Sequence, residues 1–208
     1  PFGASREIHI GYATVRATRI SYVGELGWEL YIPTEFMTHV YDTIVGQGEA
    51  LGLQLAGFHA MNSLRMEKAF RAWGEDVTER DTALEAGLSS FVAFDKGVEF
   101  IGREALLRQH EAGLKRRLAV FVIDDPEPLL LGHEPIYRDG RLVGQITSGD
   151  FGHTVDRSIG LGYVENEEGV NADFIRFGSY EIEILARRYS ATVRLTGPHD
   201  PDGLRLRS

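Results

Sequence analysis

The chain has 208 residues and a mass of 23.2 kDa, which suits one large domain or two small ones. Its formal net charge of -9 and pI of about 5.3 disfavour nucleic acid and anionic membranes as partners, because the mean surface would repel both. A mean hydropathy of -0.18, with 43% hydrophobic and 25% charged residues, indicates neither disorder nor a membrane span. The absence of Cys excludes disulfides, a thiolate nucleophile and a Cys-ligated metal. A reducing compartment is the natural home, so we expect a cytoplasmic protein, or a matrix protein in a mitochondrion.

The N-terminal region begins PFGASREIHIGY, with no initiator Met and no signal-peptide pattern, so we expect a piece of a longer protein. Residues 8 to 32 alternate between apolar and polar side chains, as β-strands do. The run IHIGYATVRATRISYV leads through GELG into WELYI, which predicts two strands joined in a hairpin. Residues 35 to 45 then repeat apolar side chains at helical spacing, and Thr34 is the expected N-cap.

Two further helices are expected before the character of the chain changes. The segment FHAMNSLRMEKAF, residues 58 to 70, predicts a helix on which Arg65 and Glu67 form a buried pair network. After a polar turn region, Gly102 opens a third helix, REALLRQHEAG. A boundary is expected near residues 113 to 115.

The C-terminal part of the chain reads as a series of short strands. LAVFVI, EPIYRDGRLVGQITSG, SIGLGYV, DFIRFGSYEIEIL and SATVRL are separated by Gly, Asp-Gly and Gly-Ser turns, with no helix between them. Such a pattern favours a small barrel or sandwich. We therefore predict an α+β protein, in which residues 1–113 form the second part of an α/β domain and residues 114–208 form a small, jelly-roll-like β-barrel.

Glu29 stands between Trp28 and Leu30, in a run that otherwise resembles a buried strand. If GELG is a four-residue hairpin loop, Tyr22 pairs directly with Glu29, and directly opposed side chains share a face. A carboxylate on a half-buried aromatic face needs hydrogen-bond donors. A heterocycle with an N–H beside an amino group, such as a pterin or guanine, would supply two. The alternative is that Glu29 points to solvent or pairs with an arginine such as Arg19.

Four blocks of sequence resemble one protein family. RISYVGELGWELYIP is similar to the (R)-x-(S/T)-Y-T-G-E-x-G-(Y/W)-E segment of the glycine cleavage T protein, the aminomethyltransferase. NSLRMEKAFRAWGEDVTERDTALEAG, FDKGVEFIGREAL and GQITSGDFGHTVDRSIGLGYV follow in the family's order. In detail, these blocks are most similar to the folate-binding region of dimethylglycine and sarcosine dehydrogenases.

The resemblance implies a tetrahydrofolate site in which Tyr22 and Glu29 contact the pterin. Met61 stands where the T protein has an arginine that contacts folate, a departure that favours the dehydrogenase-type subgroup. Arg117 aligns with a basic position near that site, although a solvated arginine is an equal alternative. Trp73 is a weaker candidate for a ligand contact than for a core or junction residue. The family's essential carboxylate lies upstream of Pro1, so no catalytic residue is expected in this chain.

The function implied by the resemblance is capture of a one-carbon unit as methylene-tetrahydrofolate, in a dimethylglycine or sarcosine dehydrogenase-type protein. FAD would then belong only to a missing upstream domain, and the missing N-terminal portion of the same protein would complete the folate site. One alternative is a stand-alone T protein, with a lipoyl carrier protein as partner. Another is a non-catalytic folate-binding or regulatory module. The fragment alone is expected to be inactive.

Other chemistries have weaker support. None of the seven His residues has the spacing of a metal pair, and we expect no metal site. His153 is a weak candidate for catalytic duty, and the favoured alternative is a loop histidine at the barrel rim. Neither phosphate-binding glycine pattern occurs, so the chain itself should not bind ATP or FAD.

Overall fold

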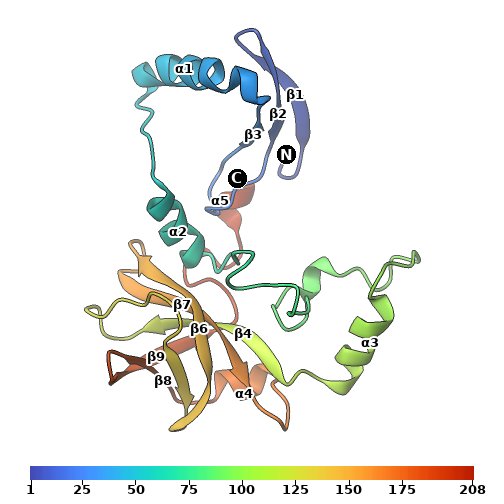
Figure 1. Ribbon diagram of the computed structural model, residues 1–208, viewed down its shortest axis with the longest axis vertical. Coiled ribbons are helices and arrows are strands. Elements are labelled where there is room, and N and C mark those ends of the chain that lie inside the picture. Colours follow the sequence, from blue (N-terminus) through green and yellow to red (C-terminus); the bar gives the residue numbers. More distant parts are fainter. The chain divides into compact units, whose positions relative to one another are not determined.

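A computed structural model describes residues 1–208 and divides them into two compact units (Figure 1). The first unit comprises Pro1–Leu64 and Asp202–Ser208, and the second comprises Arg65–Pro201. The helix expected over residues 58 to 70 is α2 (Phe58–Glu67), and its last turn belongs to the second unit. No helix combines the length and the apolar character that crossing a bilayer requires.

The first unit contains a three-stranded antiparallel sheet, drawn in blue in Figure 1. Its strands are β1 (Ser5–Ile10), β2 (Ala13–Thr18) and β3 (Glu29–Tyr31), in that spatial order. One face of β2 buries Ala13 and Val15 against Val40 of helix α1 (Met37–Gly48). The other face carries polar residues, as a two-period strand with one buried side requires.

The antiparallel pairing predicted across GELG is present between β2 and β3, but the predicted four-residue loop and its register are wrong. Strand β2 ends at Thr18, which lies opposite Glu29, and residues 19 to 28 form a loop that contains GELG. The tight turn of this unit joins β1 to β2 at Gly11 and Tyr12. Arg19 explains the early end of β2: its buried guanidinium donates hydrogen bonds to the carbonyl oxygens of Gly27, at 3.2 Å, and Ser208, at 2.7 Å. These bonds fold the loop back on itself where a longer strand would run straight.

The helical elements of the first unit also differ in detail from the prediction. Thr34 does not cap α1, because a 3-10 turn over Thr34–Phe36 precedes the helix and neither start has a side-chain cap. Helix α1 continues to Gly48, and a second 3-10 turn, Glu49–Leu51, follows it. The unit closes with α5 (Leu204–Arg207), whose Arg205 pairs with Glu25 at 2.6 Å.

The second unit is built around a closed barrel of six antiparallel strands in the order β4-β7-β6-β5-β8-β9 (Figure 1). The strands are β4 (Arg116–Ile123), β5 (Pro135–Arg138), β6 (Arg141–Gly152), β7 (Arg157–Glu165), β8 (Tyr180–Ile184) and β9 (Arg187–Arg194). The long connection from β4 to β5 lets β7 return beside β4, which is a Greek key. The predicted all-β barrel is therefore confirmed.

The barrel is closed over an apolar interior. Phe121, Ile136, Ile146 and Ile182 are fully buried there. Helix α4 (Ala172–Arg176) also contributes Ile175 to this core, so the strand predicted ahead of the Gly178-Ser179 turn is wrong, whereas the strand after that turn is present as β8. The side chain of Asn171 accepts a hydrogen bond from the backbone N–H of Phe174 and caps the helix.

A second apolar cluster lies on the outer side of β4 and β7. Leu118, Leu161 and Tyr163 pack there against Met66 and Ala69, which follow from the end of α2. The chain between α2 and the barrel includes a 3-10 turn (Ser89–Phe91) and helix α3 (Arg103–Ala112), which confirms the third predicted helix. The boundary near residues 113 to 115 stays a prediction, since the compact units divide earlier, after Leu64.

Candidate functional site

The sheet of the first unit presents one polar face, which is the best candidate for ligand contact. Cross-strand partners on this face bond in pairs. Ser5 meets Thr18 at 3.0 Å, and Glu7 Oε1 meets Arg16 Nη2 at 3.1 Å. The register also sets Thr18 opposite Glu29 and Arg16 opposite Tyr31, so side chains from all three strands share the face.

Glu29 is half-buried at the start of β3, and Tyr31 lies beside it on the same face, two residues along the strand. The Tyr31 hydroxyl donates a hydrogen bond to Glu29 Oε2 at 2.9 Å, and its ring is 55% exposed. This bond and the negative charge of Glu29 raise the pKa of the Tyr31 phenol. Glu29 Oε1 accepts no hydrogen bond. The carboxylate is thus held on one side and open on the other.

The Glu29 carboxylate keeps acceptor positions for a ligand that carries two adjacent donors. An ionised carboxylate has about four acceptor positions, and the Tyr31 bond uses one of them. An N–H and an adjacent amino group can therefore bind both oxygens while Tyr31 stays in place. The alternative pairing of Glu29 with Arg19 is not found, because Tyr31 is the bonded partner.

Tyr22 lies in the loop of residues 19 to 28 and not in the sheet, so strand register does not bring its ring beside Glu29. Its side chain is half-buried and does make a contact of its own. Trp28, in the same loop, is exposed and lies 5.9 Å from the Arg19 guanidinium. The folate contact predicted for Tyr22 stays a prediction, without the register argument that favoured it.

The other predicted contact residues lie in different places. Met61 is half-buried on α2. Trp73 is 76% exposed, which does not match a core position, one of the two alternatives that the sequence favoured. Arg117 occupies the strand face that continues into the barrel interior, and its buried Nε atom has no hydrogen-bond partner. Burial and the nearby charge of Arg176 lower the pKa of Arg117. A ligand role for any of the three stays a prediction.

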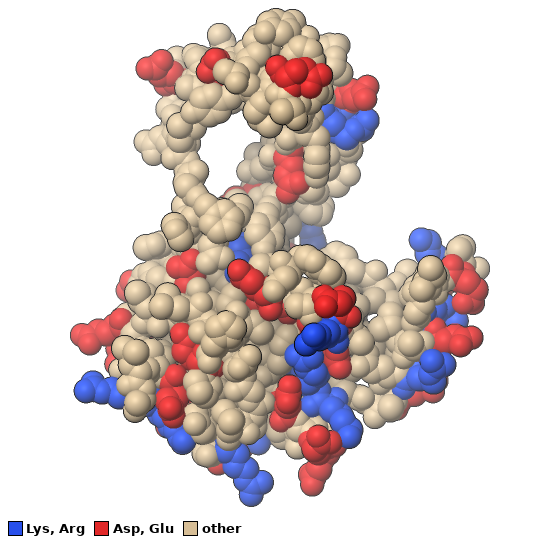
Figure 2. Space-filling model, viewed as in Figure 1, with Lys and Arg blue, Asp and Glu red and all other residues tan.

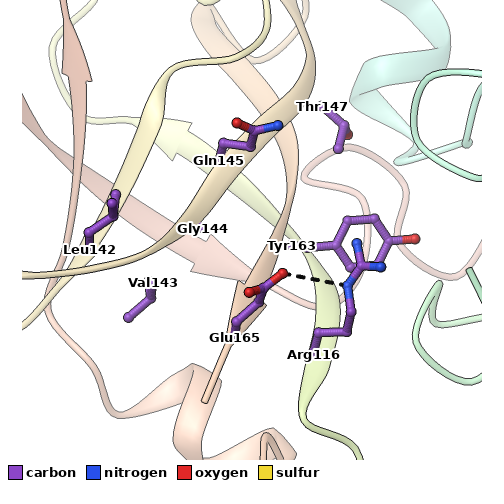
Figure 3. Close-up of a pocket in the computed structure, with 8 residues that line it drawn as sticks. All are labelled: Arg116, Leu142, Val143, Gly144, Gln145, Thr147, Tyr163 and Glu165. Carbon is purple, nitrogen blue, oxygen red and sulfur yellow. Dashed lines mark ion pairs between the residues drawn. The ribbon is translucent and has the colours of Figure 1, made fainter. Parts of the chain in front are cut away.

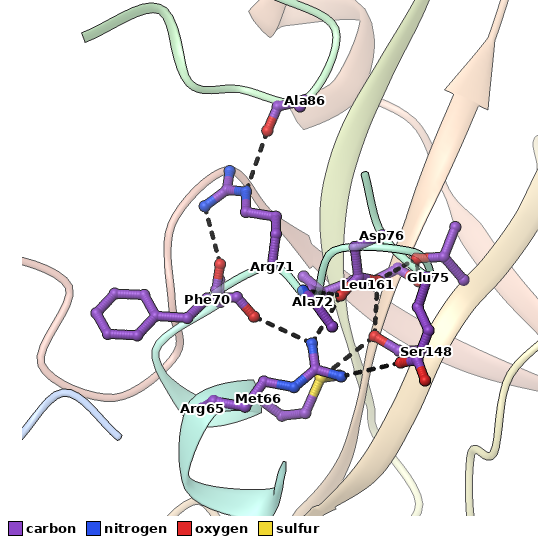
Figure 4. Close-up of polar contacts among 12 residues, drawn as sticks. Arg65, Met66, Phe70, Arg71, Ala72, Glu75, Asp76, Ala86, Ser148 and Leu161 are labelled. Carbon is purple, nitrogen blue, oxygen red and sulfur yellow. Dashed lines mark hydrogen bonds and ion pairs between the residues drawn. The ribbon is translucent and has the colours of Figure 1, made fainter. Parts of the chain in front are cut away.

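A buried network around Asp76 is the feature that sequence reasoning missed (Figure 4). Arg65, 1% exposed, donates to Asp76 Oδ2 at 2.7 Å, and the backbone N–H of Ala72 donates to the same oxygen at 2.9 Å. Ser148 donates to Oδ1 at 2.6 Å, and Thr147 also contacts Oδ1. Both ends of a fully buried ion pair are therefore satisfied, which such a pair requires.

Glu67 forms a separate buried site at the end of α2. Its Oε1 accepts hydrogen bonds from the backbone N–H groups of Thr154, at 2.5 Å, and Val155, at 3.0 Å. Arg65 and Glu67 are therefore both buried, as expected, but they bond to different partners and not to each other. Glu67 thus fastens the last turn of α2 directly to the turn between β6 and β7, and Arg65 is linked to β6 through Asp76.

A cavity of about 440 Å³ opens beside β6 and β7 (Figure 3). Arg116 lies in it with its guanidinium 4.0 Å from the centre of the Tyr163 ring. The same guanidinium pairs with Asp81 at 2.8 Å and Glu165 at 3.7 Å. The protein's own carboxylates therefore already pair with the one cation that lines the cavity, which leaves it no unpaired positive charge for an anionic ligand.

The remaining polar surface gives no stronger site. Figure 2 shows Lys and Arg side chains interspersed with Asp and Glu on the face in view. No group of three or more His, Asp or Glu side chains is placed to hold a metal ion. His153 lies exposed on the turn between β6 and β7, with its ring against Phe151 at 5.3 Å.

Comparison with known proteins identifies both parts of the chain. Residues 1–96 match the family described as the GCVT N-terminal domain, and residues 116–200 match the Glycine cleavage T-protein C-terminal barrel domain. The fold matches the crystal structure of glycine cleavage system aminomethyltransferase T from Bartonella henselae, with a TM-score of 0.75. That match covers 88% of this chain and 49% of the other, at 23% identity, and so concerns the fold alone.

Relatives with more similar sequences include sarcosine dehydrogenase of Homo sapiens, which is 40% identical over 100% of this chain and 23% of its own length. The pyruvate dehydrogenase phosphatase regulatory subunit of Mus musculus is 41% identical over 91% of this chain and 23% of its own length. An aminomethyltransferase of Thermoanaerobacter pseudethanolicus is 36% identical over 82% of this chain and 44% of its own length. The chain thus spans about a quarter of the first two relatives.

Fold and domain content together define an aminomethyltransferase-like protein with a C-terminal barrel. The chain belongs to the glycine cleavage T-protein family and is related to the sarcosine and dimethylglycine dehydrogenases. The family resemblance predicted from the four sequence blocks is therefore confirmed.

Proposed function

We propose that this chain supplies part of the tetrahydrofolate site, and the barrel that follows it, in a protein of the dimethylglycine or sarcosine dehydrogenase type. The whole protein would capture a one-carbon unit as methylene-tetrahydrofolate. Family membership and the similarity to sarcosine dehydrogenase support this proposal. The observation that carries it is the Glu29 carboxylate, which is held by Tyr31 on a polar sheet face and has one open oxygen.

In this proposal Glu29 binds the pterin edge of the folate, and Tyr22 is the second contact. Bound tetrahydrofolate would supply the nitrogen atoms that accept the one-carbon unit. The chain's own part is to orient the folate, because Glu29 offers two acceptor oxygens in a fixed plane. Proton transfer is assigned to a carboxylate upstream of Pro1, so the 208 residues alone should turn over nothing. FAD, if the protein uses it, would bind upstream as well.

Titration of a reduced folate into the natural polypeptide that contains these residues tests the proposal. Glu29→Ala should weaken folate binding at least tenfold, since a bidentate charged contact contributes roughly 1.5 to 3 kcal/mol. Glu7→Ala is the matched control, because it removes another carboxylate from the same sheet face. We expect that variant to bind folate within about twofold of the wild type. Equal affinities for Glu29→Ala and the wild type would refute the proposed site.

Two other functions have specific support among the relatives. A stand-alone T protein, with a lipoyl carrier protein as partner, is favoured by the aminomethyltransferase that is 36% identical. A non-catalytic regulatory module is favoured by the regulatory subunit that is 41% identical. Folate binding by the natural polypeptide without any one-carbon transfer would favour the regulatory module. Transfer that requires a lipoyl carrier and no flavin would favour the T protein.

The names of the relatives support a proposal for the compartment. Sarcosine and dimethylglycine dehydrogenase relatives from mammals are named as mitochondrial proteins. A matrix location is therefore proposed if the source is a eukaryote, and a cytoplasmic one otherwise. Fractionation of the source cells, with detection by an antibody to the barrel, checks this assignment.

A further inference from the structure

The hydrogen bond from Tyr31 to Glu29 involves a residue that the family pattern of Tyr22 and Glu29 does not include. A glutamate side chain has three rotatable bonds, and fixing such a chain costs conformational entropy. A tyrosine has only two rotatable bonds, so it is the stiffer partner. The 2.9 Å bond from the Tyr31 hydroxyl therefore restricts Glu29 before any ligand arrives.

The cross-strand neighbours of this pair are engaged elsewhere. Thr18, opposite Glu29, bonds to the hydroxyl of Ser5 at 3.0 Å. Arg16, opposite Tyr31, pairs with Glu7 at 3.1 Å. Tyr31 is consequently the side chain on this face that bonds to Glu29, and it bonds to one oxygen only.

We propose that Tyr31 is a positioning residue, whose hydroxyl holds Glu29 Oε2 so that Oε1 stays turned outward to receive the N–H donors of a pterin. This inference rests on the proposed folate site and adds a residue to it. Tyr31 would raise affinity through Glu29 and without a ligand contact of its own. Ordering the acceptor before binding lowers the entropy lost when the ligand binds.

A double-mutant cycle on the natural polypeptide tests the inference. Folate affinity is measured for the wild type, Tyr31→Phe, Glu29→Ala and the double variant. Tyr31→Phe should weaken binding about threefold to tenfold, because Glu29 keeps both acceptor oxygens but must then be ordered by the ligand itself. In the Glu29→Ala background the same change should have no further effect. Tyr12→Phe is the matched control, because Tyr12 is an exposed tyrosine that stacks on His39, away from Glu29.

The outcomes separate this inference from the proposed function. If Glu29→Ala binds folate as well as the wild type, the folate site itself is wrong. If Glu29→Ala loses affinity but Tyr31→Phe does not, only the role of Tyr31 is overturned. If Tyr31→Phe lowers folate affinity by the same factor in the wild type and in Glu29→Ala, Tyr31 acts independently of Glu29. That result also overturns the positioning role.

A spectroscopic pH titration of the 208-residue chain tests the contact between Tyr31 and Glu29 directly, without folate. Tyrosine ring NMR signals are followed at rising pH, and the Tyr31 signal is assigned by its absence from Tyr31→Phe. The Tyr31 signal should titrate above the ordinary tyrosine range, and Glu29→Gln should return it to that range. A Tyr31 titration that ignores Glu29→Gln would contradict the contact.

Discussion

The unit with the sheet of β1 to β3 and the unit with the barrel of β4 to β9 differ in how completely a carboxylate is hydrogen-bonded. In the sheet, Glu29 lies on an open polar face and keeps one oxygen without a hydrogen bond. In the barrel unit, Asp76 is fully buried and both of its oxygens are bonded. The two regions belong to one chain, yet the carboxylate stays partly open in the first and is fully bonded within the fold in the second.

This difference shows how to separate a candidate contact from a structural ion pair. A buried charge without partners costs several kcal/mol, so Asp76 must find all of its partners within the protein. An exposed face imposes no such requirement, so an oxygen can stay available there. A strong ion-pair network is therefore poor evidence for a site in this chain, and a partly bonded carboxylate is better evidence.

The largest effect is expected in the barrel unit. Asp76→Ala leaves Arg65 buried without its main partner, and we expect the free energy of unfolding to fall by about 3 to 5 kcal/mol. Urea unfolding of the 208-residue chain measures the change. Glu75→Ala is the control: this carboxylate is exposed and meets the same guanidinium at 3.6 Å. Its loss should cost at most about 1 kcal/mol, and equal losses for the two variants would show that Asp76 is not the centre of the network.

A pH-dependent effect of intermediate size is expected at Asp81. Burial acts to raise the pKa of this carboxyl group, but hydrogen bonds from Thr78 and the charge of Arg116 outweigh it and hold the pKa below its usual value. A lowered pKa in the folded state stabilises the protein above the ordinary carboxyl pKa of about 4. That stabilisation is lost as the pH falls through the folded value.

Asp81→Asn should therefore destabilise the chain by roughly 1 kcal/mol near neutral pH. Relative to the wild type, the loss should shrink in strong acid, where the wild-type carboxyl group is itself protonated. Unfolding curves for both proteins at several pH values measure this difference. A difference that does not change with pH would show that the charge of Asp81 contributes no stability.

The smallest effect on stability is expected at the sheet face. Glu29→Ala removes a half-buried side chain whose only hydrogen bond comes from an exposed tyrosine, so the free energy of unfolding should change by less than about 0.5 kcal/mol. The same urea titration measures it. A loss of several kcal/mol would make Glu29 a structural residue like Asp76 and would erase the contrast between the two regions.

Local periodicity was sufficient to predict the helices at residues 58 to 70 and 103 to 113, and the all-β barrel. It failed where an extended segment was not a strand. Residues 19 to 28 alternate as a strand does, but the carbonyl oxygens that bind Arg19 lie at Gly27 and at the chain's distant Ser208. No local pattern encodes a partner that is so far away in sequence.

The candidate site was predicted in part for the same reason. Glu29 was identified as an unusual carboxylate from its apolar neighbours, but the ring beside it was assigned from a hairpin register that does not exist. The ring that does contact Glu29 belongs to Tyr31, two residues further along the same strand. Side chains two residues apart on a strand share a face, so this contact is compatible with any prediction of a strand here. The Asp76 network escaped prediction because its members come from three separate segments.

The outer apolar cluster has a consequence for how this protein can be divided. Met66 and Ala69 cover Leu118, Leu161 and Tyr163, although they precede the first barrel strand by almost fifty residues. A fragment that begins at Arg116 would expose this apolar patch to solvent and would be prone to self-association. A soluble, separately folding barrel would have to begin at or before the final turn of α2, which makes this helix a part of two modules at once.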